Sequence, residues 1–515
     1  MPLSPRLYTF LCGSVAAFGA ALFGYDLGVI SYVTVAPNFL SVTGLEEPTT
    51  QNENYLGFIV SSMLLGAFAG SVPAGLIADK FSRRFSIVVG GLVFIVGGIL
   101  QTAAASKGMM MAGRFFAGWG IGSLGVLVPL YQSEIAHPSQ RGRMIATFQF
   151  SLGLGAFIAG WVAYGCAQGS PGTALQWRLP LAFQMFPAIP LVSLIYLLPE
   201  SPRWLMIKGR QEESLRALAR LHASGNIEDP FVQGEFMEMR SKVTEEASMQ
   251  ASWSDIFRNR TNARKVLLGV ILQFSVQMTG VSAIQYYSPR VYSAVGFKGN
   301  TPLLIQSINN INGLAGELLC ILFLDKVGRR IPLIGGNIIS GICFAVCTGL
   351  AKQFATGTTS SRGLGILFVA MTFIYNNIFS SCIGPLSWVY PVEIMNTGIR
   401  AKAASLTTMA SWLANFMIGQ VSPIAFAKIG WRYYLVFTVC SFTNALTFYL
   451  FFPETKGRTL EEMDSYFRDN HWIVPLARVQ GVSVSEREQQ LAHGQTTAVL
   501  PHESKEEPVV YEEKA

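Results

Sequence analysis

The chain has 515 residues, of which 50% are hydrophobic and only 13% are charged. Soluble domains usually carry about 25% charged residues, so this composition excludes an ordinary soluble protein and indicates immersion in a membrane. The formal net charge is +7, but no basic stripe is interleaved with aromatic residues, so we expect no nucleic-acid partner.

Apolar stretches of about 18 or more residues are typical of membrane-spanning helices. About twelve follow one another, which predicts an all-α, multi-pass protein embedded in the lipid bilayer. They lie at residues 9–30, 55–78, 86–105, 109–131, 144–166, 179–198, 266–288, 302–324, 331–351, 363–388, 403–424 and 433–452. The first is longer than the apolar core of a signal peptide and contains a charge, so we interpret it as a retained helix.

Basic residues recur in alternate loops between these spans. They are Lys80, Arg83 and Arg84 after the second span, Arg141 and Arg143 after the fourth, Lys326, Arg329 and Arg330 after the eighth, and Arg400 and Lys402 after the tenth. The loop at 37–54 has three glutamates and no basic residue. By the positive-inside tendency, the basic loops and both termini are cytoplasmic.

Two pairs of fragments indicate an internal duplication. Residues 69–84 and 315–330 share their Ala-Gly start and their Asp-Lys-x-x-Arg-Arg end, and residues 131–141 and 390–400 share Tyr, Glu, Ile and Arg at the same offsets. Each fragment follows the second or fourth span of its half. Two parallel six-helix halves are typical of the major facilitator fold.

This duplication divides the chain into four parts. We expect a first six-helix half at 1–198 and a second at 264–452. Between them, 199–263 is polar and has helical spacing, which predicts short amphipathic cytoplasmic helices. Residues 453–515 form a cytoplasmic C-terminal segment, mostly a disordered tail.

The seven cysteines lie in or beside apolar spans and form no CxxC pair. We therefore expect no metal site and no disulfide. The chain also contains no phosphate-binding loop, HExxH motif or serine nucleophile elbow, so we expect neither an enzyme nor a bound cofactor.

Eight motifs appear in order over about residues 9–465. They are FGYDLGVI (23–30), GLIADKFSRR (75–84), GRFFAGWGIG (113–122), PESPRWL (199–205), TGVSAIQYYSP (279–289), DKVGRR (325–330), IGPLSWVYPVEI (383–394) and PETKGRTLEEM (453–463). The chain resembles the sugar porter family of major facilitators, although Ser82 replaces the family's usual Gly. The resemblance implies transport of a hexose, pentose or polyol by alternating access, in the plasma membrane. We expect the monomer to be functional.

Asp26 and Arg114 are ionisable residues inside predicted spans, where a charge is costly unless it is paired or solvated. Both lie roughly 6–8 Å below the outer surface at about 1.5 Å per residue. An acid that pairs reversibly with an arginine can couple transport to protons. The resemblance implies the same, because proton-coupled sugar porters have an acid at this position. A static structural pair is the alternative.

Polar and aromatic residues in the spans are candidates for the substrate site, because amides match hydroxyls that both donate and accept. By resemblance, Gln149, Gln277, Trp388 and Asn415 match sugar-contacting positions. Other candidates are Ser282, Gln285, Tyr286, Asn310 and Trp412. The alternative for each is helix packing. Val276 and Ser282 replace a Gln and an Asn that are common in the family, so the substrate need not be glucose.

Gln306, Asn310, Gly313 and Glu317 share one face of the eighth predicted span. A polar face within a span must lie toward the bundle interior or water. Glu317 is then either a second protonatable site or part of a structural ion pair.

Charged residues next to the spans predict a cytoplasmic gating network that closes the inner side and breaks when that side opens. Its members are Asp79, Arg83, Arg84, Glu134, Arg141, Glu200, Arg203, Asp325, Arg329, Arg330, Glu393, Arg400 and Glu454. The alternative is that they only orient the protein, but orientation does not require acids.

The leading hypothesis is a sugar–proton symporter in which the proton is the coupling ion. The alternatives are a facilitative sugar uniporter and a sugar sensor that does not transport. A sensor needs a long cytoplasmic extension for partners, and the segment after Glu454 is short.

Overall fold

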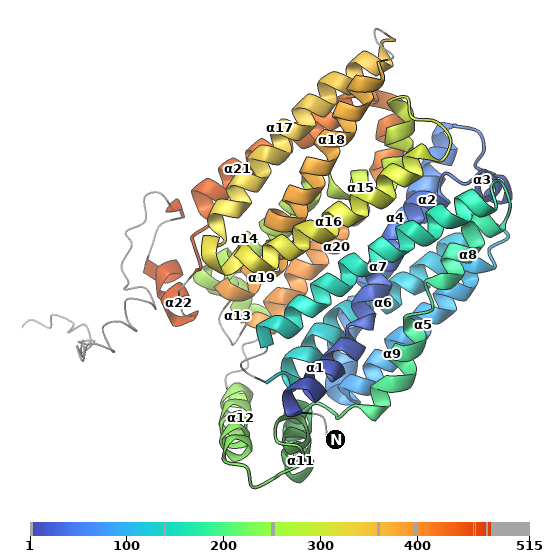
Figure 1. The fold of residues 1–515 in the computed structure, drawn as a ribbon. Helices are drawn as coiled ribbons and strands as arrows, with labels where there is room; N and C mark the ends of the chain where they lie inside the picture. The colour runs from blue at the N-terminus through green and yellow to red at the C-terminus, as the bar shows by residue number, and fades with distance from the viewer. Residues whose placement is uncertain are drawn as a thin grey trace, which may run out of the picture.

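The computed structural model describes residues 4–137, 141–248, 253–357, 361–395, 399–456, 458, 460–469 and 472–474. The regular structure in these ranges is helical. Two long helical bundles lie side by side, one from each half of the chain, with a group of short helices at one end (Figure 1).

The first bundle contains the N-terminal helices. They are α1 (Pro5–Ala16), α2 (Phe18–Val33), α3 (Pro37–Thr43), α4 (Thr50–Lys80), α5 (Arg83–Thr102), α6 (Lys107–Ile135), α7 (Arg141–Gly169), α8 (Leu175–Phe183), α9 (Ala188–Leu194) and the 3-10 turn η2 (Ile195–Leu197). Helices α4 and α6 approach closely because glycines line their contact. A Cβ on Gly66 would overlap the carbonyl of Phe115, and one on Gly118 would overlap that of Met63.

The second bundle contains the C-terminal helices. They are α14 (Arg260–Met278), α15 (Val281–Ala294), α16 (Thr301–Val327), α17 (Arg330–Ala355), α18 (Arg362–Ile378), the π-turn η3 (Phe379–Ile383), α19 (Gly384–Ile394), α20 (Arg400–Ile429) and α21 (Arg432–Phe451). The bundles meet through α4 with α20, α7 with α16, and α2 with α15.

Among the described residues, ten helical segments are long and apolar enough to cross a membrane. Two further helices, α16 and α20, have 27 and 30 residues, which brings the segments to the twelve predicted spans. The helices start and end several residues away from the predicted bounds. The first predicted span is broken at Ala17, and the seventh at Thr279 and Gly280, where Gly280 has φ 90°.

Proline accounts for breaks in two other spans. The sixth span loses α-helical structure between α8 and α9, just before Ala188, and Pro187 precedes α9. In the tenth span the π-turn η3 precedes Gly384 and Pro385, because a proline nitrogen cannot donate the helical hydrogen bond.

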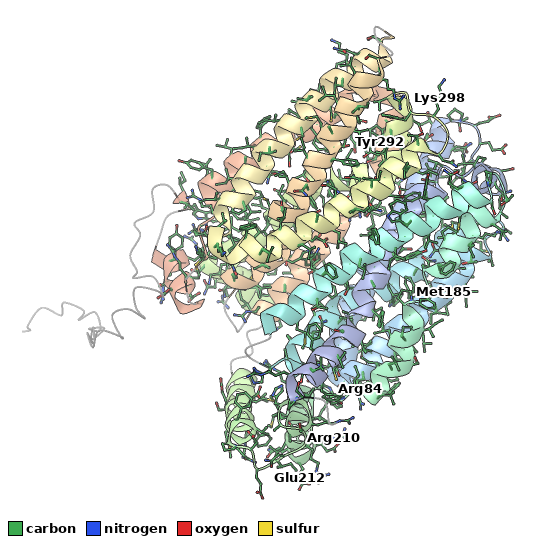
Figure 2. The ribbon with its side chains drawn as sticks, in the orientation of Figure 1. Arg84, Met185, Arg210, Glu212, Tyr292 and Lys298 are labelled. Carbon is green, nitrogen blue, oxygen red and sulfur yellow. The ribbon has the colours of Figure 1, made fainter. Side chains whose placement is uncertain are left out.

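Residues between the bundles form α10 (Pro202–Ile207), α11 (Gln211–His222), α12 (Pro230–Ser248) and α13 (Trp253–Arg258), and α22 (Leu460–Asp469) follows the second bundle. We call the end with α11 and α12 the linker end and the end with α3 the loop end (Figure 1). Figure 2 shows Arg84 and Arg210 at the linker end and Lys298 at the loop end. The predicted tail beyond residue 474 lies outside the described residues.

All seven cysteines are free thiols. Helix α22 is attached by Asp464, which lies 2.6 Å from the ammonium nitrogen of Lys265, a fully buried side chain of α14. The C-terminal segment therefore begins with a helix packed on the second bundle.

Candidate functional site: an interface between two bundles

Asp26 on α2 and Arg114 on α6 form a fully buried ion pair. Arg114 Nη1 donates to Asp26 Oδ1 over 3.2 Å. Asp26 Oδ2 and Arg114 Nε have no hydrogen-bond partner among the described residues. This single, end-on contact is weaker than a bidentate one, so the pair is suited to separation. Both residues lie about 10 Å from the loop-end termini of their helices.

Tyr286 connects this pair to the second bundle. It is buried on α15, a helix that packs against α2, and it lies within electrostatic reach of both Asp26 and Arg114. Its hydroxyl donates to Asn415 Oδ1 on α20 over 3.1 Å. The charged pair of the first bundle therefore lies next to a predicted substrate residue of the second.

Gln277 and Ser282 lie on opposite sides of the break between α14 and α15. The Ser282 hydroxyl donates to Gln277 Oε1 over 2.7 Å, so the two side chains form one polar unit. The break follows Gln277, in the last turn of α14, and precedes Ser282, in the first turn of α15. Gln285 is half-buried and has no hydrogen bond to another described side chain.

Gln149 on α7 lies at the contact with α16. Its Nε2 donates to Glu317 Oε1 over 3.2 Å, which links the two bundles. Asn310, also on α16, donates to the Ala156 carbonyl of α7 over 3.0 Å and accepts from Gln306. Of the polar face predicted on the eighth span, Asn310 and Glu317 thus face the first bundle, whereas Gly313 lies against Asn376 of α18.

The two tryptophans differ in their surroundings. Trp412 on α20 is buried, and its ring centre lies 5.4 Å from that of Phe23 on α2. Trp388 on α19 is 43% exposed. The structure therefore brings Trp412 to the interface of the bundles, and it shows no packed contact for Trp388 with the other candidates among the described residues.

Arg83 is the centre of the linker-end network in the first bundle. It donates through Nε and Nη2 to both oxygens of Glu134, each over 3.1 Å, and through Nη1 to Asp79 over 2.7 Å. Beside it, Arg84 donates to Glu200 over 3.2 Å. The hydroxyl of Tyr131 donates to the Pro199 carbonyl over 2.6 Å.

The second bundle repeats this arrangement. Arg329 donates to Glu393 over 2.9–3.2 Å, and Glu454 accepts from the backbone nitrogens of Arg329 and Arg330. The Tyr390 hydroxyl donates to the Pro453 carbonyl over 2.9 Å. The sequence repeat is thus also a repeat of contacts.

Four predicted members of the network remain. Arg203 lies on α10, and Arg400 donates to the Met395 carbonyl over 3.3 Å. The side chains of Arg141 and Asp325 lie outside the described residues. The ion pairs of Arg83, Arg84 and Arg329 each join residues of the same half of the chain.

Sequence reasoning missed the contacts that join the bundles at the loop end. Arg290 on α15 lies 2.9 Å from Glu53 on α4. Gln420 on α20 accepts from Ser61 and donates to Asn54 over 2.6 Å. The signal for Arg290 was an arginine directly after an apolar span.

Comparison with known proteins identifies the architecture and the family. The family described as "Sugar (and other) transporter" matches residues 12–467. The chain belongs to this family. It is a multi-pass membrane protein with the twelve-helix major facilitator fold, and its family consists of transporters and not of enzymes.

Individual relatives of this sugar transporter family cover most of the chain. It is 32% identical to "MFS-type transporter criB" of Aspergillus cristatus over 465 residues, which covers 90% of this chain and 94% of that one. It is 30% identical to "High-affinity glucose transporter" of Kluyveromyces lactis, over 90% and 86% of the two chains. A structure of the proton:xylose symporter XylE bound to 6-bromo-6-deoxy-D-glucose matches with TM-score 0.74 and 26% identity, over 90% and 99%.

Proposed function

We propose that the chain is a symporter that couples uptake of a small neutral sugar or polyol to protons by alternating access. The observation that carries this proposal is the buried, end-on Asp26–Arg114 pair beside Tyr286, which is itself bonded to Asn415. We further propose that the protein lies in the plasma membrane with its linker end on the cytoplasmic side. We also propose that the monomer is functional.

In this mechanism a proton from the loop-end side binds a carboxylate oxygen of Asp26. The neutral acid no longer attracts Arg114 as strongly, so the arginine is free to move. Movement of α2 or α6 would then displace Tyr286 and so change the position of Asn415. Substrate binding and protonation would thus favour the same state, which is the requirement for coupling. Release of the proton at the linker end would restore the ion pair.

The remaining candidates would bind the substrate from both bundles. Gln149 lies on the first bundle, and the Gln277–Ser282 unit, Tyr286, Asn310, Trp412 and Asn415 lie on the second. Paired amide and hydroxyl groups match the hydroxyls of a sugar, and Trp412 offers an aromatic face for its apolar side. A hexose, a pentose and a polyol all fit these groups.

The linker-end network would act as the inner gate. Each half of it is built around one arginine, Arg83 or Arg329, that is held within its own bundle. When the linker end closes, these arginines would approach the opposite bundle and exchange part of their contacts. Related proteins support the proposal, because they include a proton:xylose symporter and a high-affinity glucose transporter.

The proposal is tested by uptake of labelled sugars into proteoliposomes with and without an inward proton gradient. The panel contains hexoses, pentoses and polyols. We expect the gradient to drive accumulation by the wild type, whereas Asp26→Asn equilibrates the sugar without accumulating it. The control is Glu212→Gln, which makes the same chemical change in an exposed ion pair of α11.

Other results would contradict the proposal in different ways. Uptake that does not respond to the gradient would identify a uniporter. Binding of a sugar without uptake would favour a sensor. Accumulation by Asp26→Asn equal to that of the wild type would assign proton coupling to another residue.

A further inference from the structure

Glu317 is a buried acid between the two bundles. Among the described residues, only one oxygen of its carboxyl group has a hydrogen-bond partner. It lies on α16 and is 8% exposed. Its Oε1 accepts from Gln149, whereas Oε2 has no hydrogen-bond partner among the described residues. None of the ion pairs between described residues includes Glu317. Among the residues that the structure describes, the ion-pair alternative for Glu317 therefore has no cation to support it.

The opposite helix leaves room for this carboxyl group. Gly153 on α7 faces Glu317, and a Cβ at that position would overlap Oε2. The absence of a side chain lets the carboxyl lie against α7, one helical turn along from Gln149. The acid and the glycine are therefore matched across the interface of the bundles.

Other polar residues of α16 make a different kind of contact with α7. Asn300, directly before α16, donates to the Ala167 carbonyl over 3.3 Å, and Ser307 and Asn310 on α16 donate to the Gly160 and Ala156 carbonyls over 3.1 and 3.0 Å. Such bonds hold two helices together through backbone acceptors. Glu317 contacts a side chain that is a predicted sugar ligand, and its second oxygen remains available as an acceptor.

We propose that Glu317 is a substrate-binding residue that accepts a hydrogen bond from one hydroxyl of the sugar while Gln149 binds the neighbouring hydroxyl. This inference rests on the proposed function. A carboxyl oxygen can accept, whereas each sugar hydroxyl can donate, so the two groups are complementary. Since Gln149 and Glu317 lie within hydrogen-bond distance of each other, they address adjacent hydroxyls, and the ligand is a vicinal diol. In the empty carrier the two side chains hold each other in position.

The test measures KM for the best-transported sugar of the panel and for its monodeoxy analogues, in proteoliposomes. The variants are Glu317→Ala, Glu317→Gln and Gly153→Ala. We expect Glu317→Ala to raise KM for the parent sugar about tenfold or more, because it removes one buried acceptor. For one deoxy analogue, the one lacking the bound hydroxyl, wild type and variant should have nearly the same KM.

The other variants sharpen the assignment. Glu317→Gln keeps an acceptor oxygen and should have a smaller effect than Glu317→Ala. Gly153→Ala should raise KM because its methyl group displaces the carboxyl. The matched control is Gly165→Ala on the same helix, where an added Cβ meets no atom within 4 Å. Elution as a single species in size-exclusion chromatography shows that each variant is folded.

Two results would overturn the inference alone, namely an unchanged KM in Glu317→Ala, or a rise that is equal for every deoxy analogue. Equal rises would mean that Glu317 shapes the interface without binding a particular hydroxyl. A wild type that transports no sugar of the panel would overturn the proposed function, and the inference with it.

Discussion

Arg290 Nη1 lies 2.9 Å from Glu53 Oε2, and this ion pair joins the second bundle to the first at the loop end. The Gln420 amide reinforces the same end by bonding to both Ser61 and Asn54 of α4. At the linker end, Arg83 and Arg329 instead have carboxylate partners within their own bundles. The conformation described is therefore one in which the bundles are attached to each other by ionic contact at the loop end.

Breaking the Glu53–Arg290 pair should open the loop end. The side chains are 13% and 31% exposed, so removing either partner should cost about 1–2 kcal/mol and shift a two-state equilibrium by roughly 5- to 30-fold. We expect Glu53→Gln and Arg290→Gln to increase the population with the longer distance between spin labels on α4 and α15. The double exchange Glu53→Arg with Arg290→Glu should restore the shorter distance.

The control for this pair is Lys298→Gln, which removes a positive charge from an exposed position at the same end (Figure 2). It should leave the distance distribution unchanged. If Lys298→Gln opens the loop end as far as Arg290→Gln does, general electrostatics and not the ion pair would be responsible.

The two acids bound to Arg83 should contribute unequally to stability. The side chain of Glu134 is 5% exposed, whereas that of Asp79 is 70% exposed. Removing the arginine leaves the Glu134 charge buried and unpaired, so Arg83→Ala should destabilise the protein by about 3–5 kcal/mol. Asp79→Asn breaks only an exposed pair and should cost under about 1 kcal/mol.

The measurement is thermal unfolding in detergent, followed by intrinsic fluorescence. Arg329→Ala provides an internal comparison, because Glu393 is 28% exposed and should tolerate the loss of its partner better than Glu134 does. Equal losses of stability in Arg83→Ala and Asp79→Asn would show that the burial of the acid does not determine how much its ion pair contributes to stability.

Acidification should weaken the packing of α11 and α12 against the linker end of the first bundle. His137 stacks on Phe231 of α12, with ring centres 4.8 Å apart, and lies near His222, which is bonded to Glu235. Burial and the nearby His222 lower the pKa of His137 from its usual 6.5, against a smaller opposing effect of Glu235. The attached state therefore favours the neutral ring, and stability is lost as the pH falls below about 6.5.

The measurement is the distance between a spin label on α12 and one on α6, from pH 8 to pH 5. We expect this distance to be longer at pH 5 than at pH 8. His137→Phe keeps the stacked ring but cannot bind a proton, so its distance should depend much less on pH. A wild-type distance that stays constant over this range would show that protonation of His137 does not affect the attachment.

Residues that repeat in the sequence also repeat in their contacts, because the two halves of the chain fold in the same way. The duplicated Tyr, Glu and Arg positions became duplicated contacts, such as Tyr131 with Pro199 and Tyr390 with Pro453. The Asp26–Arg114 pairing could be inferred because an unpaired charge within a span is unfavourable and both residues lie at similar depth.

Contacts between the bundles were harder to predict. Nothing in the order of residues reveals that Gln149 lies beside Glu317, or that Arg290 finds Glu53, because these contacts depend on how helices from different halves pack. The break at Ala17 was missed for a related reason. Alanine favours helix, so the residue at that position does not signal a turn.

The hydrogen bonds from α16 and from Asn300 directly before it use backbone acceptors on α7, namely the carbonyls of Ala156, Gly160 and Ala167. Every amino acid supplies such a carbonyl, so many side chains of α7 could change during evolution without loss of these bonds. During evolution, Gln149 and its neighbours could then change so that the site accepts a new substrate, while the two halves keep the same packing against each other. A change of substrate would then involve the side chains of α7, whereas the contact with α16 would be kept by the backbone carbonyls of the same helix.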